Sequence, residues 1–155
     1  MSPLAAHIAR ETVVSALISG AISAAFFLGL FGLDSAVPVR GLGGVAADFV
    51  PQSAPVAFMA CLVPALLARR AVAAGRIAGT VEPQRRALVG LALICAILAA
   101  MLGGAVALLW IASGVIAIAP LPALLIKIAY GALLGALVTR RVLRRLLRPN
   151  PPPKE

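Results

Sequence analysis

One basic side chain stands inside a long apolar run in the last third of the chain. Lys127 lies in the stretch ALLIKIAYGALLG, which contains no other charged residue. A lysine at the centre of a membrane-spanning helix costs about 2.5–3.5 kcal/mol, and such residues usually face a bundle interior or an aqueous cavity. The alternative is snorkelling, in which the aliphatic stem lifts the ammonium toward the headgroups. The sequence favours neither arrangement.

A polar stretch in the first half of the chain offers partners for this lysine. RGLGGVAADFVPQSAP, residues 40–55, places Arg40, Asp48 and Gln52 between two apolar runs. A carboxylate in contact with a buried ammonium offsets part of the cost of burying it. We therefore expect a candidate polar site of Lys127, Asp48, Gln52 and Arg40, in which Asp48 is the partner of Lys127. The alternative is a solvated loop whose charges are unpaired.

The sequence contains no pattern that indicates catalysis. His7, the only histidine, precedes the first apolar run, and Cys61 and Cys95 lie inside apolar runs without metal-ligand spacing. No nucleophile motif, phosphate loop or dinucleotide fingerprint occurs. GLGG at 41–44 lacks the flanking strand and helix of a phosphate cradle. We expect no catalytic residue, no cofactor and no bound metal.

Four apolar segments are long enough to hold these residues in a bilayer. A hydrocarbon core of about 30 Å needs about 20 helical residues. The first span exceeds the apolar core of a secretory signal, which has about 7–15 residues, so it is expected to stay uncleaved. The predicted fold is an all-α integral membrane protein, a four-transmembrane-helix bundle. Its spans are expected at about residues 12–33, 53–70, 87–112 and 120–139.

The second span is short for a full crossing and carries two prolines. Pro55 suits a first helical turn, with Ser53 as the N-cap. Pro64 should kink the helix and free a carbonyl near Ala60, which neighbouring helices must then cover in lipid. To complete the crossing, we expect an interfacial, re-entrant-like loop between the first two helices. In it, residues 34–52 fold back over the bundle.

Small residues at four-residue spacing predict close helix contacts in the first and fourth spans. Such spacing lets two helix backbones approach and lets hydroxyl groups bond across the contact. It does not decide whether the contact is within one chain or between two copies. The residues are Ser15, Ser19, Gly20, Ser23, Gly131 and Gly135.

The composition excludes an ordinary soluble domain. Of 155 residues, 62% are hydrophobic and 12% charged, against about 45–50% and about 25% in soluble domains. The net charge of +9 comes from arginines without an aromatic platform or recognition motif, so nucleic acid is not an expected partner. The excess of arginine over lysine and the many alanines are typical of a GC-rich bacterial genome, which suggests a bacterial inner membrane.

Arginines occur mainly in segments that the positive-inside rule assigns to the cytoplasm. These are the chain before residue 12, the connection 69–86 and the segment after residue 139. Both termini are therefore expected in the cytoplasm, and 34–52 and 113–119 outside. Residues 1–148 are expected to form one membrane domain, and the proline-rich 149–155 a disordered tail.

The segment 140–148 is expected to be a basic extension of the fourth helix along the interface. Each base near an anionic surface contributes about 1 kcal/mol. We expect these arginines to contact headgroups of anionic lipids. They are Arg140, Arg141, Arg144, Arg145 and Arg148.

Two classes of function remain. The first is a non-catalytic membrane subunit or scaffold that makes helix–helix and anionic-lipid contacts, alone, as a homo-oligomer or in a larger complex. It is preferred because no pathway of intramembrane polar residues is evident. The alternative is a small oligomeric transporter or channel in which Lys127 binds an anionic substrate or headgroup. In size alone the chain resembles small multidrug exporters, but those depend on a glutamate in the first span, and 12–33 contains no acid.

Overall fold

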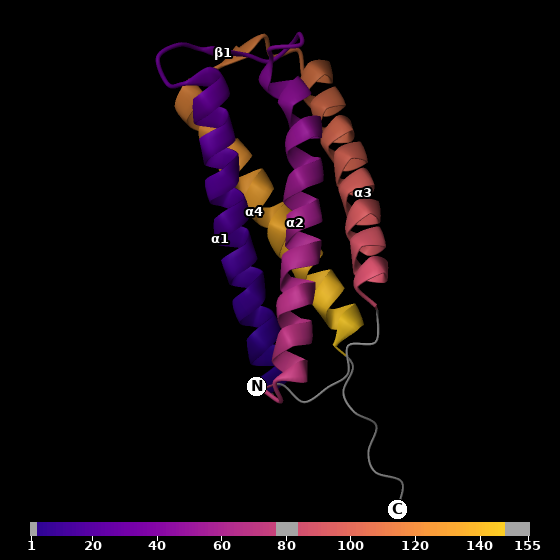
Figure 1. Cartoon of the computed structure of the whole chain (residues 1–155). Coiled ribbons are helices and arrows are strands. Elements are labelled where there is room, and N and C mark those ends of the chain that lie inside the picture. The colour runs from indigo at the N-terminus through magenta and orange to yellow at the C-terminus, as the bar shows by residue number, and fades with distance from the viewer. Residues whose placement is uncertain (1–2, 77–83, 148–155) are drawn as a thin grey trace, which may run out of the picture.

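The computed structural model describes residues 3–76 and 84–147. In these residues it contains four helices, each long and apolar enough to cross a membrane, as expected for a multi-pass membrane protein. The prediction of an all-helical bundle of four spans is thereby confirmed at the level of the helices. The elements, in chain order, are α1 (Pro3–Phe31), β1 (Val37–Pro38), α2 (Val45–Ala73), α3 (Arg85–Ala112), β2 (Ala117–Ile118) and α4 (Pro120–Leu146) (Figure 1).

α1, α3 and α4 lie where the sequence predicts spans, and two of them extend beyond the predicted bounds. α3 and the start of α4 agree with it within two residues, and α4 continues through its basic segment to Leu146. α1 begins at Pro3 rather than near residue 12. Its first turns carry polar residues but no helix-breaking residue, so the helix extends beyond the apolar span.

The expected start of the second helix near Ser53 is wrong. α2 begins at Val45 and runs for 29 residues through Pro51, Pro55 and Pro64. Each proline removes one backbone donor. Packing offsets that loss, because Val45 and Phe49 in the early turns are buried. The second half of the expected loop is therefore helix, and the re-entrant loop is not confirmed.

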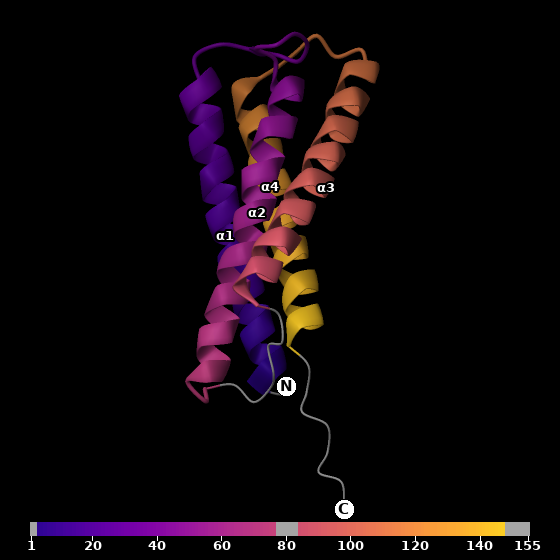
Figure 2. The same cartoon turned by 45° about the vertical axis from the view of Figure 1, so that its right-hand side comes forward.

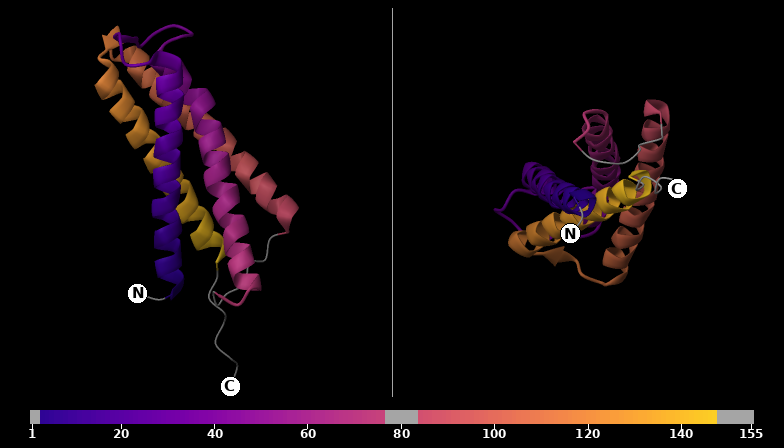
Figure 3. Two further views of the ribbon diagram at one scale, coloured as in Figure 1. Left: turned by 60° about the vertical axis from the view of Figure 1, so that its left-hand side comes forward. Right: turned by 90° about the horizontal axis from the view of Figure 1, so that it is seen from below.

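α4 is the helix that holds the bundle together. α1 packs along α4, α2 packs along α3, and α2 also contacts α4. Figure 1 and the left panel of Figure 3 show α4 running obliquely behind α1 and α2, and in Figure 2 the upper part of α3 lies on the side of α2 away from α1. Side chains on α4 can therefore meet side chains from both α1 and α2.

The connections of one end of the bundle form a small cap, and we call this end the sheet end. β1 and β2 pair antiparallel, with Val37 opposite Ile118, and the amide of Val39 donates to the carbonyl of Ile116 at 2.9 Å. Val37 and Val39 are buried in one apolar cluster with Phe27 of α1. The connection between α1 and α2 thus covers the end of the bundle.

The opposite end, where α1 and α3 begin and α2 and α4 end, carries most of the arginines, and we call it the arginine end (Figure 1). Between the two ends, large apolar side chains such as Leu17, Leu109 and Leu133 remain about 70% exposed. Exposed apolar surface of this extent on long apolar helices is what a lipid environment would cover.

Candidate functional site

One face of α4 carries the residues around which the buried polar groups gather. Lys127, Gly131, Gly135 and Thr139 recur every four residues, and all four are buried. Because residues four apart share a helix face, Lys127 points to the same side as the small residues that contact α1. The sequence thus directs Lys127 into the interior of the bundle.

Lys127 forms an ion pair with Asp48. Its Nζ lies 2.6 Å from Oδ2 of Asp48, and the two side chains are 0% and 9% exposed. Nζ also lies 4.1 Å from the ring centroid of Phe49, where the ring face attracts a cation. Asp48 stands in the first turn of α2, where the helix dipole favours a negative charge.

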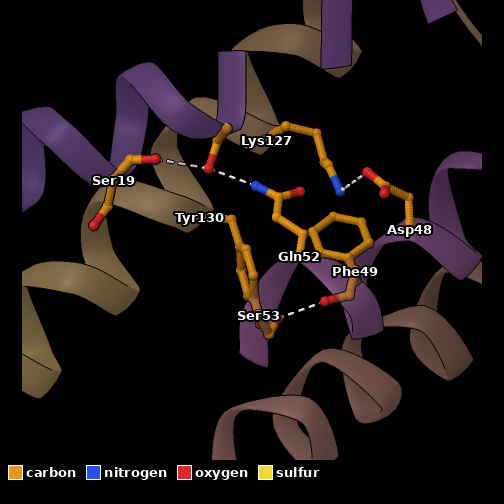
Figure 4. A network of polar contacts seen from close by, with 8 residues as sticks. Ser19, Asp48, Phe49, Gln52, Ser53, Lys127 and Tyr130 are labelled. Atoms are coloured by element: carbon orange, nitrogen blue, oxygen red, sulfur yellow. Dashed lines mark hydrogen bonds and ion pairs between the residues drawn. The ribbon is translucent and has the colours of Figure 1, made fainter. Parts of the chain in front are cut away.

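Gln52, one turn after Asp48, links α2 to α1 (Figure 4). Its Nε2 donates to the hydroxyl of Ser23 at 2.5 Å, and Ser23 donates to the carbonyl of Ser19 at 2.9 Å. The Oε1 atom of Gln52 is buried and has no hydrogen-bond partner in the described part of the chain. The amide is therefore held from one side only.

Ser53 and Tyr130 make a second contact between α2 and α4. The Ser53 hydroxyl donates to the carbonyl of Phe49 at 2.5 Å and lies 2.7 Å from the hydroxyl of Tyr130. Because Ser53 has one hydroxyl proton and the carbonyl only accepts, Tyr130 must be the donor in the second bond. The rings of Phe49 and Tyr130 meet edge to face, with centroids 4.9 Å apart.

A third polar contact lies farther from the sheet end. Thr139 Oγ1 is 2.8 Å from the carbonyl oxygen of Ala60 and 2.7 Å from Oγ of Ser15. Ala60 precedes Pro64 by four residues, so its carbonyl is the one that a proline at that position leaves without a backbone donor. The sequence predicts this free carbonyl, and the structure identifies Thr139 as the residue that satisfies it.

The buried polar residues extend farther than the sequence indicated. From Lys127 to Thr139 they follow α4 for about 18 Å, at about 1.5 Å per residue. We call these residues the central polar cluster. They are the buried Ser15, Ser19, Ser23, Asp48, Gln52, Ser53, Lys127 and Thr139, together with the half-buried Tyr130.

Apolar residues flank the central polar cluster toward both ends of the bundle. Toward the sheet end, the cap residues Val37 and Val39 are buried. Toward the arginine end, Ala68, Leu143 and Leu147 are buried together. Polar groups line much of the bundle interior, but the described residues contain no continuous polar path from end to end.

Asp48 also borders the surface at the sheet end. A cavity of about 200 Å³ lies there, and Asp48 lines it together with Phe31, Gly44 and Pro51. Access to the ion pair is thus from the carboxylate side, whereas Lys127 is fully enclosed.

The small residues of α1 and α4 meet within the chain. A Cβ added at Gly131 would overlap the hydroxyl of Ser23, and one added at Gly135 would overlap the hydroxyl of Ser19. Gly20 faces Ile128 and Ala132 of α4 at ordinary contact distance. α4 therefore occupies the small-residue face of α1, and that face is not available to a second copy.

Arg40 does not join Lys127, Asp48 and Gln52. Its side chain is exposed at the sheet end, where Nη2 donates to the carbonyl of Ile111 at 2.9 Å. Arg140, Arg141, Arg144 and Arg145 are exposed at the arginine end. Arg148 and the tail 149–155 lie outside the described residues.

The sequence reasoning missed Phe49, Ser53, Tyr130 and Thr139. The sequence predicts Ser53 as a helix cap, but it lies inside α2. Tyr130 is three residues after Lys127, and Thr139 continues the four-residue spacing through Gly131 and Gly135, so helical periodicity could have found both.

The chemical groups of the central polar cluster are a buried ion pair, several hydroxyl groups and one amide whose oxygen has no partner in the described part of the chain. Among residues 3–76 and 84–147, no three His, Cys, Asp or Glu side chains are grouped so that they could hold a metal ion. Comparisons with protein-family models, with curated proteins and with solved structures find no match for the chain.

Proposed function

We propose that the chain is a non-catalytic membrane subunit or scaffold, whose task is contact with other helices and with anionic lipid rather than turnover of a substrate. The observation that carries the proposal is the enclosure of Lys127. Its ammonium is 0% exposed and 2.6 Å from Asp48. An enclosed cation that is neutralised by Asp48 has no free charge for an anionic substrate. The cost of burying the ammonium is offset by a residue of the same chain.

The proposed membrane is the bacterial inner membrane, with the arginine end in the cytoplasm. α1 and α3 begin there, and α2 and α4 end there, so the start of α1 and the end of α4 lie at the same end of the bundle. The positive-inside rule assigns that side to the cytoplasm. Labelling of single cysteines, introduced on a background without Cys61 and Cys95, tests the assignment. A cysteine at Ser35 should react only from outside, and reaction only from the cytoplasm would reverse the orientation.

The exposed arginines of α4 support anionic lipid as a partner. Arg140 and Arg144 line an open cavity of about 430 Å³ whose other walls are the first turns of α1, including Ile8 and Val13. A basic rim over an apolar floor suits a headgroup above the start of an acyl chain. This contact would hold the start of α1 and the end of α4 at the membrane surface.

Partner capture tests the subunit role. The tagged full chain, expressed at native level, is crosslinked in intact membranes from a photoreactive residue at exposed Leu17, and the same chain without that residue is the control. One defined crosslinked protein, or a defined crosslinked dimer, from position 17 only is the expected result. A chain that remains uncrosslinked and also transports a solute in proteoliposomes would sink the proposal.

The second candidate, a small transporter, rests on the cavity at Asp48. A cavity of about 200 Å³ at the sheet end reaches this carboxylate, and the central polar cluster continues from it along α4. Substrate-dependent flux or current in proteoliposomes, abolished by Lys127→Ala while the protein remains folded, would favour this function. Flux that is absent from the wild-type protein across anionic and cationic solutes would exclude it.

A further inference from the structure

A second cavity opens between α1 and α2 at the arginine end. Its volume is about 570 Å³, and its floor is apolar and includes Leu67. It lies on the other side of α1 from Arg140 and Arg144, which line a separate cavity. Its polar lining consists of His7, Arg10, Glu11, Arg70 and Arg76.

Helix spacing directs three of these residues to the cavity. His7, Arg10 and Glu11 stand at positions i, i+3 and i+4 of α1, which share one helix face. Arg70 faces them from the last turn of α2. Two helix ends of opposite direction thus bring basic side chains from distant parts of the sequence to one place.

The C-terminal cap of α2 places the last of them. Gly75 has a φ of +67°, its amide donates to the carbonyl of Val72 at 3.0 Å, and the amide of Arg76 donates to the carbonyl of Ala71 at 2.9 Å. This pair of bonds is the Schellman motif, which needs a left-handed residue and therefore favours glycine. The chain turns at Gly75, and Arg76 is held beside the end of the helix.

The charges in the cavity are not balanced within the described chain. Three arginines face one glutamate, and none of Arg10, Arg70 and Arg76 is in an ion pair within residues 3–76 and 84–147. Nε2 of His7 is buried and has no hydrogen-bond partner in that part of the chain. The exposed arginines that line the cavity and the unpartnered ring nitrogen of His7 are groups that can contact a bound anion.

We propose that this cavity binds a phosphate group, carried by an anionic phospholipid headgroup or by a soluble phosphate compound. A guanidinium matches phosphate with two parallel hydrogen bonds, and three guanidinium groups suit its several oxygens. Nε2 of His7 adds a donor on the α1 side in the tautomer that carries its proton there. The apolar floor is suited to the glycerol and first methylenes of a lipid, and phosphate is the chemistry that both sources share.

Glu11 predicts the direction in which the affinity for a phosphate changes when a charge in the cavity is removed. A carboxylate in the same cavity repels a phosphate. Removing that charge should therefore strengthen binding, whereas removing an arginine should weaken it. A cavity that bound a cation or an amine would show the opposite signs.

The test is titration calorimetry of the purified full chain in a neutral maltoside detergent. The probes are dioctanoyl phosphatidylglycerol, inorganic phosphate and, as a phosphate-free match, dioctanoylglycerol. We expect Arg70→Gln to weaken binding of the phosphate-bearing probe about tenfold or more, since charge-assisted hydrogen bonds are the strong ones. Arg70→Lys should retain part of the affinity, and Glu11→Gln should raise it about twofold or more.

Arg86→Gln is the matched control, because Arg86 is exposed at the same end on α3 and does not line the cavity. Thermal unfolding of each variant checks that it is folded. Binding of phosphatidylglycerol that inorganic phosphate does not displace assigns the site to lipid, and displacement admits a soluble phosphate compound. Equal effects of Arg70→Gln and Arg86→Gln, equal binding of dioctanoylglycerol, or no binding would overturn the proposal. The site shares no residue with the α4 arginines or the central polar cluster, so its failure leaves the proposed subunit role untouched.

Discussion

The hydroxyl of Thr139 on α4 lies 2.8 Å from the carbonyl oxygen of Ala60 on α2, four residues before Pro64. A buried acceptor without a donor costs about 1–3 kcal/mol, and water that would satisfy it elsewhere is scarce in a bilayer. The proline in one helix and the threonine in another are therefore a functional pair for folding, although 75 positions separate them in the sequence.

The first prediction is non-additivity of Thr139 and Pro64. Thr139→Val should lower the free energy of unfolding by about 1–3 kcal/mol, because it strands the Ala60 carbonyl. Pro64→Ala restores the backbone donor to that carbonyl, so Thr139→Val should cost at least about 1 kcal/mol less in the Pro64→Ala background. Unfolding in detergent measures all four proteins. Thr139→Ser, which keeps the hydroxyl, is the control, and equal costs in both backgrounds would contradict the pairing.

The second prediction concerns Lys127 and Asp48. Lys127→Met or Asp48→Asn leaves one buried charge without its partner, and each should cost about 3–5 kcal/mol. The double variant should recover part of that loss, since no charge is then stranded. Asp34→Asn removes an exposed acid at the same end and should change stability by about 0.5 kcal/mol or less. Strictly additive single effects would show that the ion pair does not stabilise the fold.

The third prediction compares two glycines of the α1–α4 contact. A methyl group at Gly131 would overlap the Ser23 hydroxyl, whereas one at Gly20 would meet Ile128 and Ala132 at 3.5 Å. Gly131→Ala should therefore destabilise the protein by about 1–3 kcal/mol, and Gly20→Ala should be nearly neutral or stabilising, as a gain in helix propensity. The two melting temperatures, measured in the same detergent, decide it. Equal shifts would mean that α1 and α4 are farther apart.

The fourth prediction concerns the exposed arginines of α4. Replacing Arg140, Arg141, Arg144 and Arg145 together with glutamine should weaken the attraction of this end to anionic bilayers, by about 1 kcal/mol for each base near the surface. Quenching of a fluorophore attached near position 145 by labelled headgroups measures its distance from the membrane. Arg40→Gln, at the sheet end, is the control. Unchanged quenching in vesicles with phosphatidylglycerol would count against lipid contact.

Several features of this protein follow from the sequence because they depend on neighbours along one helix. Four apolar stretches of sufficient length predict four spans, and the free carbonyl near Ala60 follows from Pro64 alone. The four-residue spacing of Ser15, Ser19 and Ser23 predicts a face for close packing. Each of these is a local property, set by 1.5 Å of rise and 3.6 residues per turn.

The start of α2 was decided by tertiary packing. Pro51 and Pro55 are local signals for a break, and they led to an expected start near Ser53. The structure begins the helix at Val45, because burial of the residues before Pro51 offsets the hydrogen bonds that the prolines remove. Helix propensity is a weak prior, and burial of a whole turn outweighs it.

The sequence names Asp48 as the preferred partner of Lys127, but it does not decide whether the lysine pairs or snorkels. Both arrangements relieve the cost of a charge in an apolar helix, so the residues alone favour neither. The oblique path of α4 places Lys127 beside the first turn of α2, and the contact of Gly131 and Gly135 with α1 sets its depth. The packing of α1, α2 and α4 fixes both the side and the depth at which Lys127 lies, and this brings the carboxylate of Asp48 to 2.6 Å from the ammonium. The two residues are 79 positions apart in the sequence, so their distance depends on tertiary packing.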